Sequence, residues 1–312
     1  MFSTFYIFHL YSFLYLCKKL HFYLNECVYK RNIIFLVNAS RPEALIATRE
    51  LSQLLLKEGF TLTTPSDVNV LGITQTPVAD LPAAELVVVL GGDGTILRGA
   101  EVARAQGIPI LGINLGHVGF LAEVEKPSLA EIASSIISKG YKTESRMVLR
   151  YSVIRSGGEI SAGWALNEVT VERDGTTMVE LFVQIDDRPL SRWGCDGLIC
   201  STPTGSTAYA FSAGGPVLWP EIDALVLLPI SAHALFSRPM VVSPQSQIVV
   251  EIESSDALLS ADALRKLPLH AGDRVLITKD DSVIKLAHVK ATLFTDRLVA
   301  KFKLPVEGWR GE

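Results

Sequence analysis

The chain has 312 residues, which is enough for two ordinary domains that each bury a core. Apolar residues make up 48% of the chain and charged residues 20%, proportions that exclude wholesale disorder. The net charge of -4 argues against a broad nucleic-acid-binding surface. The 4 cysteines form no CxxC pair, so we expect neither a disulfide framework nor a zinc site, as is typical of a cytoplasmic protein.

The first 31 residues differ from the rest of the chain. Phe2 to Leu16 is rich in aromatic residues and nearly uncharged, which would suit a signal peptide or a membrane anchor. However, this run is shorter than the ~20 residues that a spanning helix needs, and the basic residues follow it instead of preceding it. We therefore interpret residues 1–31 as an N-terminal extension translated from upstream of the true start, and expect no membrane partner.

Residues 32–145 alternate between strand and helix patterns. Short β-branched runs predict strands buried on both faces, and amphipathic stretches between them predict covering helices. This order is typical of βαβ units and predicts an α/β domain with a parallel sheet. The expected strands are Ile33–Val37, Glu85–Leu90 and Ile108–Ile113, and the expected helices are Arg41–Lys57, Thr95–Gln106 and Ser128–Ser138.

Residues 146–312 show a different pattern, in which short strands follow one another with turn residues between them. This succession predicts a second, mainly antiparallel β domain. The expected strands are Leu149–Ile154, Gly163–Glu172, Met178–Ile185, Leu198–Ser201, Ala224–Leu228, Gln247–Glu253, Arg274–Thr278 and Val283–Ala287. Because no low-complexity linker separates the domains, we expect them to meet across a substantial cleft.

A glycine-rich turn, Gly91-Gly92-Asp93-Gly94-Thr95, lies between a predicted strand and a predicted helix. Glycines there allow positive φ and a close approach to a ligand, and the first N–H groups of the helix can face a phosphate. Because the charge of Asp93 would repel a phosphate, we expect this side chain to hold a hydroxyl nucleophile or to accept its proton. The alternative is a tight turn with Asp93 as the helix cap. The chain has neither a Walker A motif nor GxGxxG.

Two further motifs lie in the predicted β domain. Asp196 to Tyr209 crowds serine, threonine, glycine and proline behind a short strand. Hydroxyl groups there could bind sugar or phosphate oxygens, and Tyr209 could offer a flat surface to a base, although a polar turn has the same composition. The pair Asn167-Glu168 lies at a predicted strand and would ordinarily be a solvated edge.

In this order the motifs resemble those of the NAD kinase family, in its bacterial, ATP- or polyphosphate-dependent type. The landmarks are GGDGT, then NE, then Asp196 to Pro216, then the PxxxHxLxxRP motif over Pro229 to Pro239. The resemblance runs from about Ile33 to Trp309. The long serine and threonine motif is highly specific, whereas diacylglycerol kinases, sphingosine kinases and phosphofructokinases carry loops related to GGDGT.

The resemblance implies a Rossmann-like N-terminal domain, a C-terminal β-sandwich that binds NAD, and an active site between them. It also implies the activity, which is phosphorylation of the 2′-hydroxyl of the adenosine ribose of NAD by ATP, giving NADP and ADP. A divalent metal ion, most simply Mg²⁺, would assist. The expected partners are the small molecules NAD and ATP and further copies of the chain in a homodimer or homotetramer, with no nucleic acid.

The resemblance also assigns roles to individual residues. Asp93 would be the catalytic acceptor of the hydroxyl proton, beside a phosphate loop formed by Gly91, Gly92 and Thr95. Asp196 would bind the nicotinamide part of NAD, and His233 would lie near the site. The remaining substrate-binding residues that it implies are Gly94 (at NAD), Arg98 (at a phosphate), Asn167 and Glu168 (at adenine and ribose), and Thr207, Ala208, Tyr209, Ala210, Phe211 and Ser212 (lining the NAD site).

Two positions depart from the pattern. Gly194 stands where many relatives carry a basic residue, and Ser260–Ala263 replaces a Cys-Asp-Gly type of turn. The alternatives are a lipid or sugar kinase of the same GGDGT superfamily, which leaves the serine and threonine motif unexplained, and a non-catalytic NAD sensor, against which the intact Asp93 argues. The choice between ATP and polyphosphate, the acceptance of NADH, the oligomeric state, and the role of Asp93 as base or positioning group stay open here.

Overall fold

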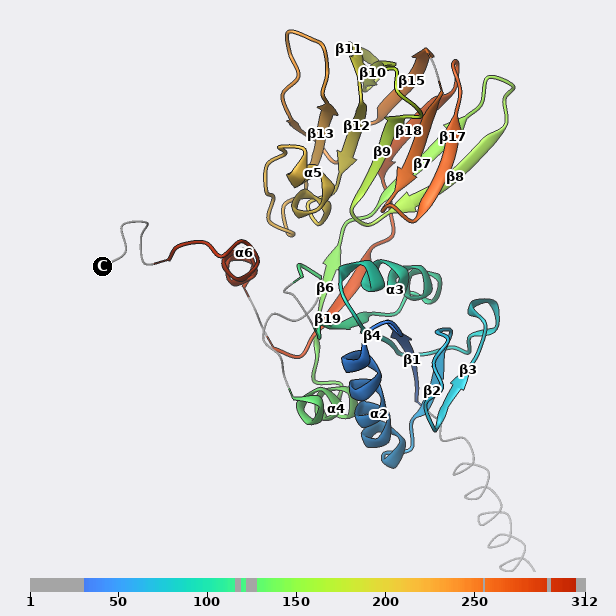
Figure 1. Ribbon diagram of the computed structural model, residues 1–312, viewed down its shortest axis with the longest axis vertical. Coiled ribbons are helices and arrows are strands. Elements are labelled where there is room, and N and C mark those ends of the chain that lie inside the picture. Colours follow the sequence, from blue (N-terminus) through green and yellow to red (C-terminus); the bar gives the residue numbers. More distant parts are fainter. Residues whose placement is uncertain (1–30, 116–118, 122–127, 255, 291–292, 307–312) are drawn as a thin grey trace, which may run out of the picture.

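The computed structural model describes residues 31–115, 119–121, 128–254, 256–290 and 293–306. Figure 1 shows an α/β part and a β-sandwich, with one helix, α3 (Asp93–Gln106), at the junction between them. The N-terminal extension expected at residues 1–31 lies outside the described residues except for Arg31. None of the described helices combines the length and the apolar character needed to cross a membrane.

The α/β part is built on a seven-stranded sheet with the order β3-β2-β1-β4-β5-β19-β6. Neighbouring strands are parallel except for β19 and β6, which are antiparallel. The strands are β1 (Asn32–Val37), β2 (Thr61–Thr64), β3 (Ile73–Gln75), β4 (Leu86–Leu90), β5 (Ile110–Ile113), β6 (Lys142–Arg146) and β19 (Ile284–His288). A short 3-10 helix, η1 (Val78–Asp80), follows β3.

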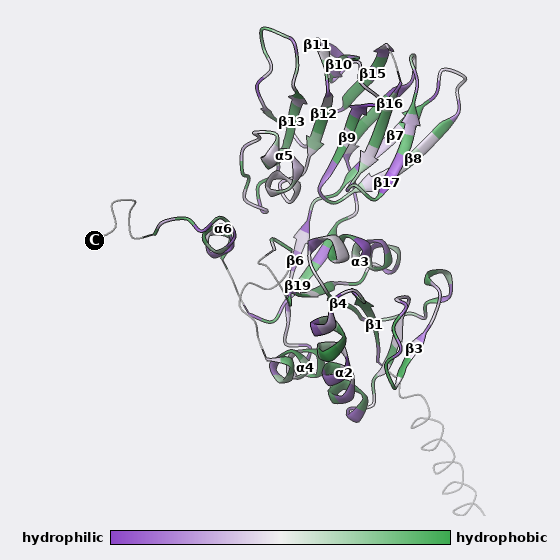
Figure 2. Ribbon diagram, viewed as in Figure 1, coloured by the Kyte–Doolittle hydropathy of each residue, from purple (hydrophilic) through white to green (hydrophobic). Residues whose placement is uncertain are grey.

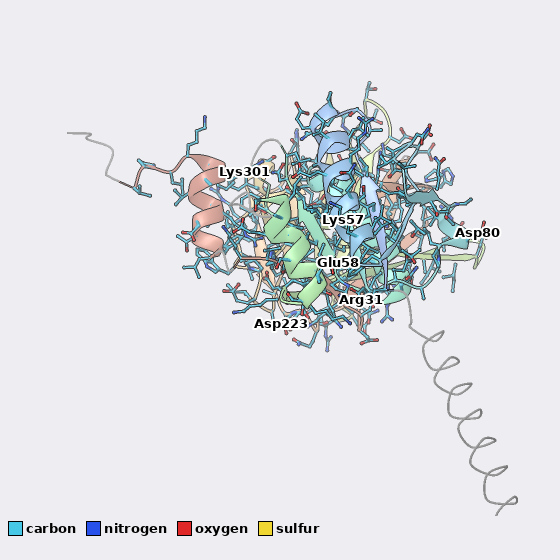
Figure 3. All side chains as sticks on the ribbon, turned by 90° about the horizontal axis from the view of Figure 1, so that it is seen from below. Arg31, Lys57, Glu58, Asp80, Asp223 and Lys301 are labelled. Carbon is cyan, nitrogen blue, oxygen red and sulfur yellow. The ribbon has the colours of Figure 1, made fainter. Side chains whose placement is uncertain are left out.

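Helices cover both faces of this sheet because alternate residues of each buried strand point to opposite faces. Ile33 and Phe35 of β1 belong to the core beneath α2 (Pro42–Lys57) and α4 (Leu129–Ser138). Ile34 and Leu36 belong to the core beneath α3 on the other face. Figure 2 shows the hydrophobic colouring of β1 and β4, and Figure 3 shows α2, with Lys57 and Glu58 labelled, beside α4.

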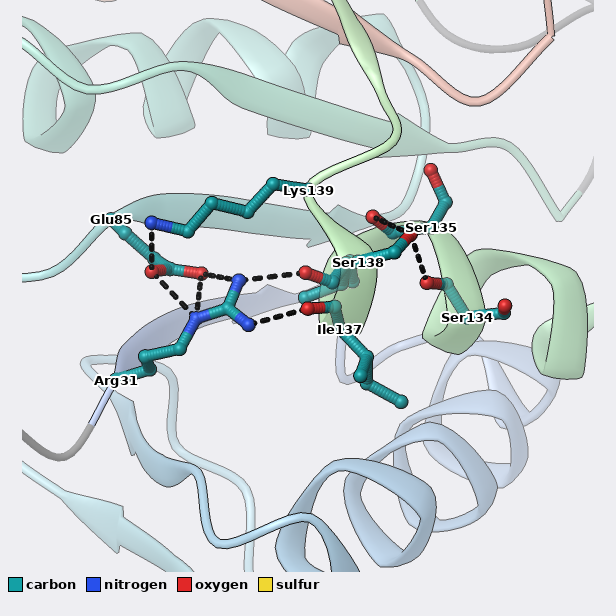
Figure 4. Close-up of polar contacts among 8 residues, drawn as sticks. Arg31, Glu85, Ser134, Ser135, Ile137, Ser138 and Lys139 are labelled. Atoms are coloured by element: carbon teal, nitrogen blue, oxygen red, sulfur yellow. Dashed lines mark hydrogen bonds and ion pairs between the residues drawn. The ribbon is translucent and has the colours of Figure 1, made fainter.

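Arg31 anchors the start of the first strand (Figure 4). Its guanidinium donates to the carboxylate of Glu85 at 2.5–3.0 Å and to the carbonyls of Ile136 and Ile137 at 2.7 and 2.6 Å. A cation is favourable at the carboxyl end of α4, where carbonyl groups lack partners within the helix. Arg31 therefore belongs to the folded domain and not to the extension to which the sequence assigned it.

The second part is a β-sandwich of two six-stranded antiparallel sheets, which confirms the expected fold class. One sheet has the order β11-β10-β15-β18-β7-β8 and the other β14-β13-β12-β9-β16-β17. The inward-facing residues of both sheets form one apolar core. The strands are β7 (Leu149–Ile154), β8 (Ile160–Ala165), β9 (Glu168–Arg173), β10 (Val179–Ile185), β11 (Arg188–Cys195), β12 (Gly197–Ser201), β13 (Leu225–Ile230), β14 (Met240–Val242), β15 (Ile248–Ser254), β16 (Ala257–Ala261), β17 (Arg265–Leu269) and β18 (Arg274–Lys279).

Two of the expected runs differ from the strands observed. The run expected at Gly163–Glu172 is divided into β8 and β9, which lie in different sheets, with Leu166 and Asn167 at the crossing. The run expected at Val283–Ala287 is not in the sandwich: β19 pairs with β5 and β6 of the first sheet. The chain therefore returns to the α/β part after building the sandwich.

The remaining helices lie near the junction. A 3-10 turn, η2 (Gly205–Thr207), and a short helix, α5 (Tyr209–Ser212), follow β12 and pack on the outer face of its sheet. The helix α6 (Phe294–Phe302) follows β19 and lies beside the junction in Figure 1. Its aromatic side chains contact rings from both parts of the molecule.

Candidate active site

A cavity of about 1130 Å³ opens at the carboxyl ends of β1, β2 and β4. β1 has β2 on one side and β4 on the other, so this is the point at which the strand order reverses, where open α/β sheets bind ligands. The cavity is larger than a phosphate needs. Its lining residues include Asn38, Arg41, Asp67, Gly92, Asp93, Gly94, Thr95, Arg98, Glu101 and Leu264.

The glycine-rich loop forms the entry to α3. Gly92 is the N-cap residue, and its carbonyl accepts from the N–H groups of Thr95 and Ile96 at 2.9 and 3.1 Å. The expectation of positive φ in this loop is wrong, because none of its glycines has one. Close packing explains Gly91 instead: a Cβ there would lie 2.5 Å from Oγ1 of Thr95. Gly94 is exposed and its missing side chain would meet nothing within 4 Å, which leaves room for a ligand.

The carboxylate of Asp93 is held by a second loop. Its oxygens accept from the backbone N–H groups of Phe120 at 3.1 Å and Leu121 at 3.3 Å. Gly119 makes this approach possible, because a Cβ there would lie 2.2 Å from Oδ1 of Asp93. Asp93 makes no capping bond to its own helix, so the alternative interpretation as a helix cap is wrong. The two donors fix the direction of the carboxylate.

Positive and negative side chains share the cavity wall. Arg98, which the sequence predicted, is exposed at this wall. Arg41 also lines the wall but was not predicted. It follows β1 and lies behind the loop, with its guanidinium 4.0 Å from the position that a Cβ of Gly92 would occupy. Asp67 after β2 was also not predicted. The available signal for Arg41 and Asp67 was position, because each lies a few residues after a parallel strand, and the carboxyl ends of these strands meet at the same sheet edge.

Asn167 and Glu168 lie across the junction, on the sandwich. They are only 8% and 6% exposed, so a solvated strand edge is the wrong interpretation of this pair. Oε2 of Glu168 is buried and lacks a hydrogen-bond partner among the described residues. Burial, and next the charge of Asp262, raise the pKa of Glu168 to about 8. A buried carboxyl with an open oxygen is poised to bond a polar ligand group.

The serine and threonine motif is built onto this pair. Oγ1 of Thr202 donates to the carbonyl of Leu166 at 2.6 Å, and its N–H donates to the carbonyl of Asn167 at 2.9 Å. Gly205 packs so closely that a Cβ would lie 2.2 Å from the Asn167 carbonyl oxygen. Ser206 accepts from the N–H of Leu218 at 2.9 Å. The hydroxyls of Thr202 and Ser206 therefore hold the turn together, as the alternative of a polar turn expected.

Tyr209 and Asp196 lie farther along the same surface; Tyr209 is 39% exposed, and so is the side chain of Asp196. The Tyr209 hydroxyl donates to Glu172 at 3.0 Å, and burial followed by the charge of Glu172 raises its pKa. The Asp196 carboxylate pairs with Nε of Arg173 at 2.7 Å. Arg173 therefore supplies a positive charge beside Asp196, in a chain that has Gly194 where many relatives carry a basic residue.

The helix α6 connects the two sides of the site. The ring of Phe302 lies between those of Phe120 and Phe211, with centroids 5.6 and 4.6 Å away. The guanidinium of Arg297 donates to the carbonyl of Phe120 at 2.7 Å. Phe120 also donates to Asp93, so α6 supports the loop that orients this carboxylate. This helix was not among the elements expected from the sequence.

The other predicted residues of the NAD-binding stretch differ in exposure. Ala210 is fully buried in a small core with Ile199 and Leu218, so it supports the stretch from behind. Thr207 and Ala208 are partly buried and Ser212 is exposed.

His233 lies apart from these residues, in the exposed segment between β13 and β14. Its N–H donates to the carbonyl of Gly194 at 2.9 Å. No described contact joins it to the cavity, and its role stays a prediction.

No group of three or more metal-ligating side chains occurs among the residues that the structure describes. The carboxylates of Asp67 and Asp93 nevertheless share the cavity. One or two carboxylates together with substrate phosphates are the usual ligands of Mg²⁺. The donor set therefore fits an ion that is held largely by the substrate.

The fold and the site define a class of protein: a two-domain nucleotide-binding protein with a glycine-rich loop at the junction. Comparison with known families makes this specific. Residues 33–141 match the ATP-NAD kinase N-terminal domain, and residues 166–289 match the ATP-NAD kinase C-terminal domain. The chain belongs to the ATP-NAD kinase family, which confirms the resemblance stated from its motifs.

Individual relatives agree with this assignment. The chain is 46% identical over 300 residues to the NAD kinase of Thermobifida fusca, covering 90% of this chain and 92% of that one. It is 52% identical over 232 residues to the NAD kinase of Corynebacterium glutamicum, covering 73% and 80%.

Two solved structures are also similar. Yeast NADH kinase complexed with NADH has a TM-score of 0.82 at 23% identity, covering 91% of this chain and 90% of that one, and shows the shared fold. An NAD kinase from Archaeoglobus fulgidus in complex with ATP has a TM-score of 0.63 at 26% identity, covering 88% and 98%.

Proposed function

We propose that this chain transfers the γ-phosphoryl group of ATP to the 2′-hydroxyl of the adenosine ribose of NAD, giving NADP and ADP. The observation that carries the proposal is the position of Asp93. Its carboxylate is held by the N–H groups of Phe120 and Leu121 at the wall of a nucleotide-sized cavity, in the first turn of α3. A carboxylate oriented in this way suits a hydroxyl nucleophile and not a phosphate.

The donor fits the cavity at the carboxyl edge of the first sheet. The N-terminus of α3 attracts phosphate oxygens through its free N–H groups and its dipole. Arg41 and Arg98 add two positive charges to the same wall. The cavity of about 1130 Å³ is large enough for a whole nucleoside triphosphate. The relative from Archaeoglobus fulgidus was solved in complex with ATP, which supports this assignment.

The acceptor fits the sandwich side of the junction. Asn167 and Glu168 offer an amide and a buried carboxyl to the adenine and ribose, and Tyr209 offers its half-exposed ring. Asp196 and its partner Arg173 would meet the nicotinamide half. The yeast protein of the same fold was solved with NADH.

The reaction requires little covalent chemistry from the protein. The 2′-hydroxyl gives its proton to the carboxylate of Asp93 while its oxygen bonds to the γ-phosphorus, and the bond to the β,γ-bridging oxygen breaks to release ADP. Positioning the two substrates in line contributes most of the rate. Asp67, at the wall of the same cavity, would hold a Mg²⁺ ion together with the donor phosphates, and this ion when bound would neutralise charge on them.

Self-association and location form part of the same proposal. Leu235 and Phe236 are 111% and 56% exposed in the segment between β13 and β14, which is the kind of apolar surface that a homodimer or homotetramer would cover. Cys195 and Cys200 are free and buried, as suits the reducing cytoplasm.

A substrate screen tests the proposal. The purified chain is incubated with ATP and Mg²⁺ and, in separate reactions, with NAD, NADH, a diacylglycerol, sphingosine and a hexose, and NMR locates the new phosphate. We expect NADP with its phosphate on the 2′-oxygen of the adenosine ribose. Phosphorylation of a lipid or a sugar alone would favour the alternative kinase, and NAD binding without any product would favour the sensor.

A further inference from the structure

The turn between β16 and β17 contains a buried aspartate that the reaction does not use directly. Asp262 is 4% exposed and lies at the tip of this hairpin, where it and Ala263 both have positive φ, at 53° and 56°. Two successive residues of positive φ are typical of a tight hairpin turn. The turn projects Asp262 away from the end of β16 and toward the start of β9.

Three consecutive backbone donors converge on this side chain. The carboxylate of Asp262 accepts from the N–H groups of Leu166 at 2.8 Å, Asn167 at 2.7 Å and Glu168 at 3.4 Å. Thr202 holds the carbonyls of the same segment from the other side. The segment of Asn167 and Glu168 is therefore fixed on both edges of its backbone, by a charge-assisted acceptor and by the serine and threonine turn.

Arg265 links the same carboxylate to the other side of the domain junction. Arg265 donates to Asp262 at 2.8 Å and also to the carboxylate of Glu101 on α3. Its guanidinium lies 4.2 Å from the ring centre of Trp164. Glu101 lines the donor cavity, and its helix begins at Asp93. An unbroken chain of contacts thus runs from the acceptor segment to the helix of the phosphate loop.

We propose that Asp262 and Arg265 are positioning residues that set the acceptor-binding segment, Asn167 and Glu168, against the helix that carries Asp93. The inference rests on the proposed function, because it concerns the alignment of NAD with the phosphoryl donor. The carboxylate of Asp262 fixes the backbone position of the segment that contains Asn167 and Glu168. The guanidinium of Arg265, which bonds both Asp262 and Glu101, fixes the distance between this segment and α3. A misalignment of about 1 Å between reacting groups is enough to cost about 100-fold in rate.

A second buried aspartate, which like Asp262 accepts from backbone N–H groups and from an arginine, supplies a matched control. Asp273 is 2% exposed and accepts from the N–H groups of His270 at 2.9 Å and Ser156 at 3.3 Å and from Arg155 at 2.6 Å. It lies beyond the other end of β17, and at the usual rise of a strand the two ends of β17 are ~13 Å apart. Its loss should destabilise the sandwich without touching the site.

The test compares Asp262→Asn and Arg265→Lys with Asp273→Asn and Arg155→Lys in the full chain. Steady-state kinetics with NAD and with ATP, calorimetric affinity for NAD, and thermal midpoints are measured for each variant. We expect Asp262→Asn to weaken NAD binding about tenfold or more, the loss that one charge-assisted bond represents, with KM for ATP unchanged. Arg265→Lys should lower kcat while NAD binding persists, because Asp262 still holds the segment.

The control variants should lower the thermal midpoint and leave all kinetic constants at the wild-type values. The proposal is overturned if Asp262→Asn and Asp273→Asn have the same kinetic effects, or if Arg265→Lys retains the wild-type kcat. If Asp262→Asn does not fold, Arg265→Lys alone decides. Failure of the wild-type chain to form NADP would refute the proposed function instead. The NAD affinities of the variants would then test separately whether Asp262 and Arg265 position the acceptor-binding segment.

Discussion

Glu168 shows how burial sets the chemistry of a single residue. The family resemblance places Glu168 in the NE motif, whereas the pair Asn167-Glu168 taken alone predicts a solvated strand edge. The burial of Glu168 depends on contacts far away in the sequence, such as the bond that its N–H donates to the carboxylate of Asp262, 94 residues later in the chain. A pattern of neighbouring residues carries no information on such a contact. The sequence could therefore predict Asp93 and Glu168, but not Asp262 or Arg265.

The raised pKa of Glu168 predicts a pH dependence of stability. In the unfolded chain this carboxyl has its ordinary pKa of 4.5, whereas in the folded chain it keeps its proton until about pH 8. The folded state therefore binds more protons in this window, and stability falls as the pH rises from about 4.5 to 8, by at most about 1.4 kcal/mol per pH unit for this group.

Replacing Glu168 with Gln removes this titration. We expect chemical denaturation of Glu168→Gln to show a shallower loss of stability between pH 5 and pH 8 than the wild type shows. Asp262, whose pKa burial raises to about 6, still titrates in the variant and leaves a smaller slope. Parallel stability curves for the two proteins would contradict the account.

At the scale of elements, periodicity predicted the parts that bury apolar residues. The buried strands β1, β4 and β5 and the helices α2, α3 and α4 were all expected within a few residues of their observed bounds. The short strands β2, β3 and β6 were missed, because Thr61–Thr64, Ile73–Gln75 and Lys142–Arg146 are mostly polar. Their pairing partners, and not their own composition, make them strands.

The helix α6 was missed for a related reason, since its apolar face meets rings that are distant in sequence. We expect Phe302→Ala to weaken NAD binding, because the ring of Phe302 packs against Phe211 in the predicted NAD-binding stretch and against Phe120, which bonds Asp93. Each aromatic pair contributes about 0.5–1.5 kcal/mol. Titration calorimetry with NAD measures the effect. Lys301→Ala is the matched control, because Lys301 is exposed on the same helix (Figure 3). Equal affinities for the two variants would contradict this role of α6.

At the scale of the whole molecule, the two parts share one of the apolar clusters. The apolar cluster beneath α3 includes Val148 and Leu166 from the sandwich side together with Ile284 and Leu286 of β19. Arg104 of α3 pairs with Asp280 at 3.0 Å across the same junction. The sequence predicted two domains with the cleft between them, but it assigned β19 to the wrong one. The returning strand was unpredictable because its pattern is the same in either sheet.

This shared cluster predicts cooperative unfolding. Because β19 lies between β5 and β6, the first sheet cannot be complete without chain from beyond the sandwich. We expect differential scanning calorimetry of the full chain to show one transition whose calorimetric and van't Hoff enthalpies agree. Two separated transitions, one for each part, would show that the junction contributes little to stability.

The central claim is that Asp93 acts on the hydroxyl of bound NAD, and its removal tests this most directly. NADP formation from NAD, ATP and Mg²⁺ is measured for the wild type and for Asp93→Asn, with NAD affinity measured in parallel. We expect the variant to fold and bind NAD but to lose about 10²–10⁴-fold in kcat, the usual contribution of a placed general base. A variant that retained more than about a tenth of the wild-type turnover would contradict the claim.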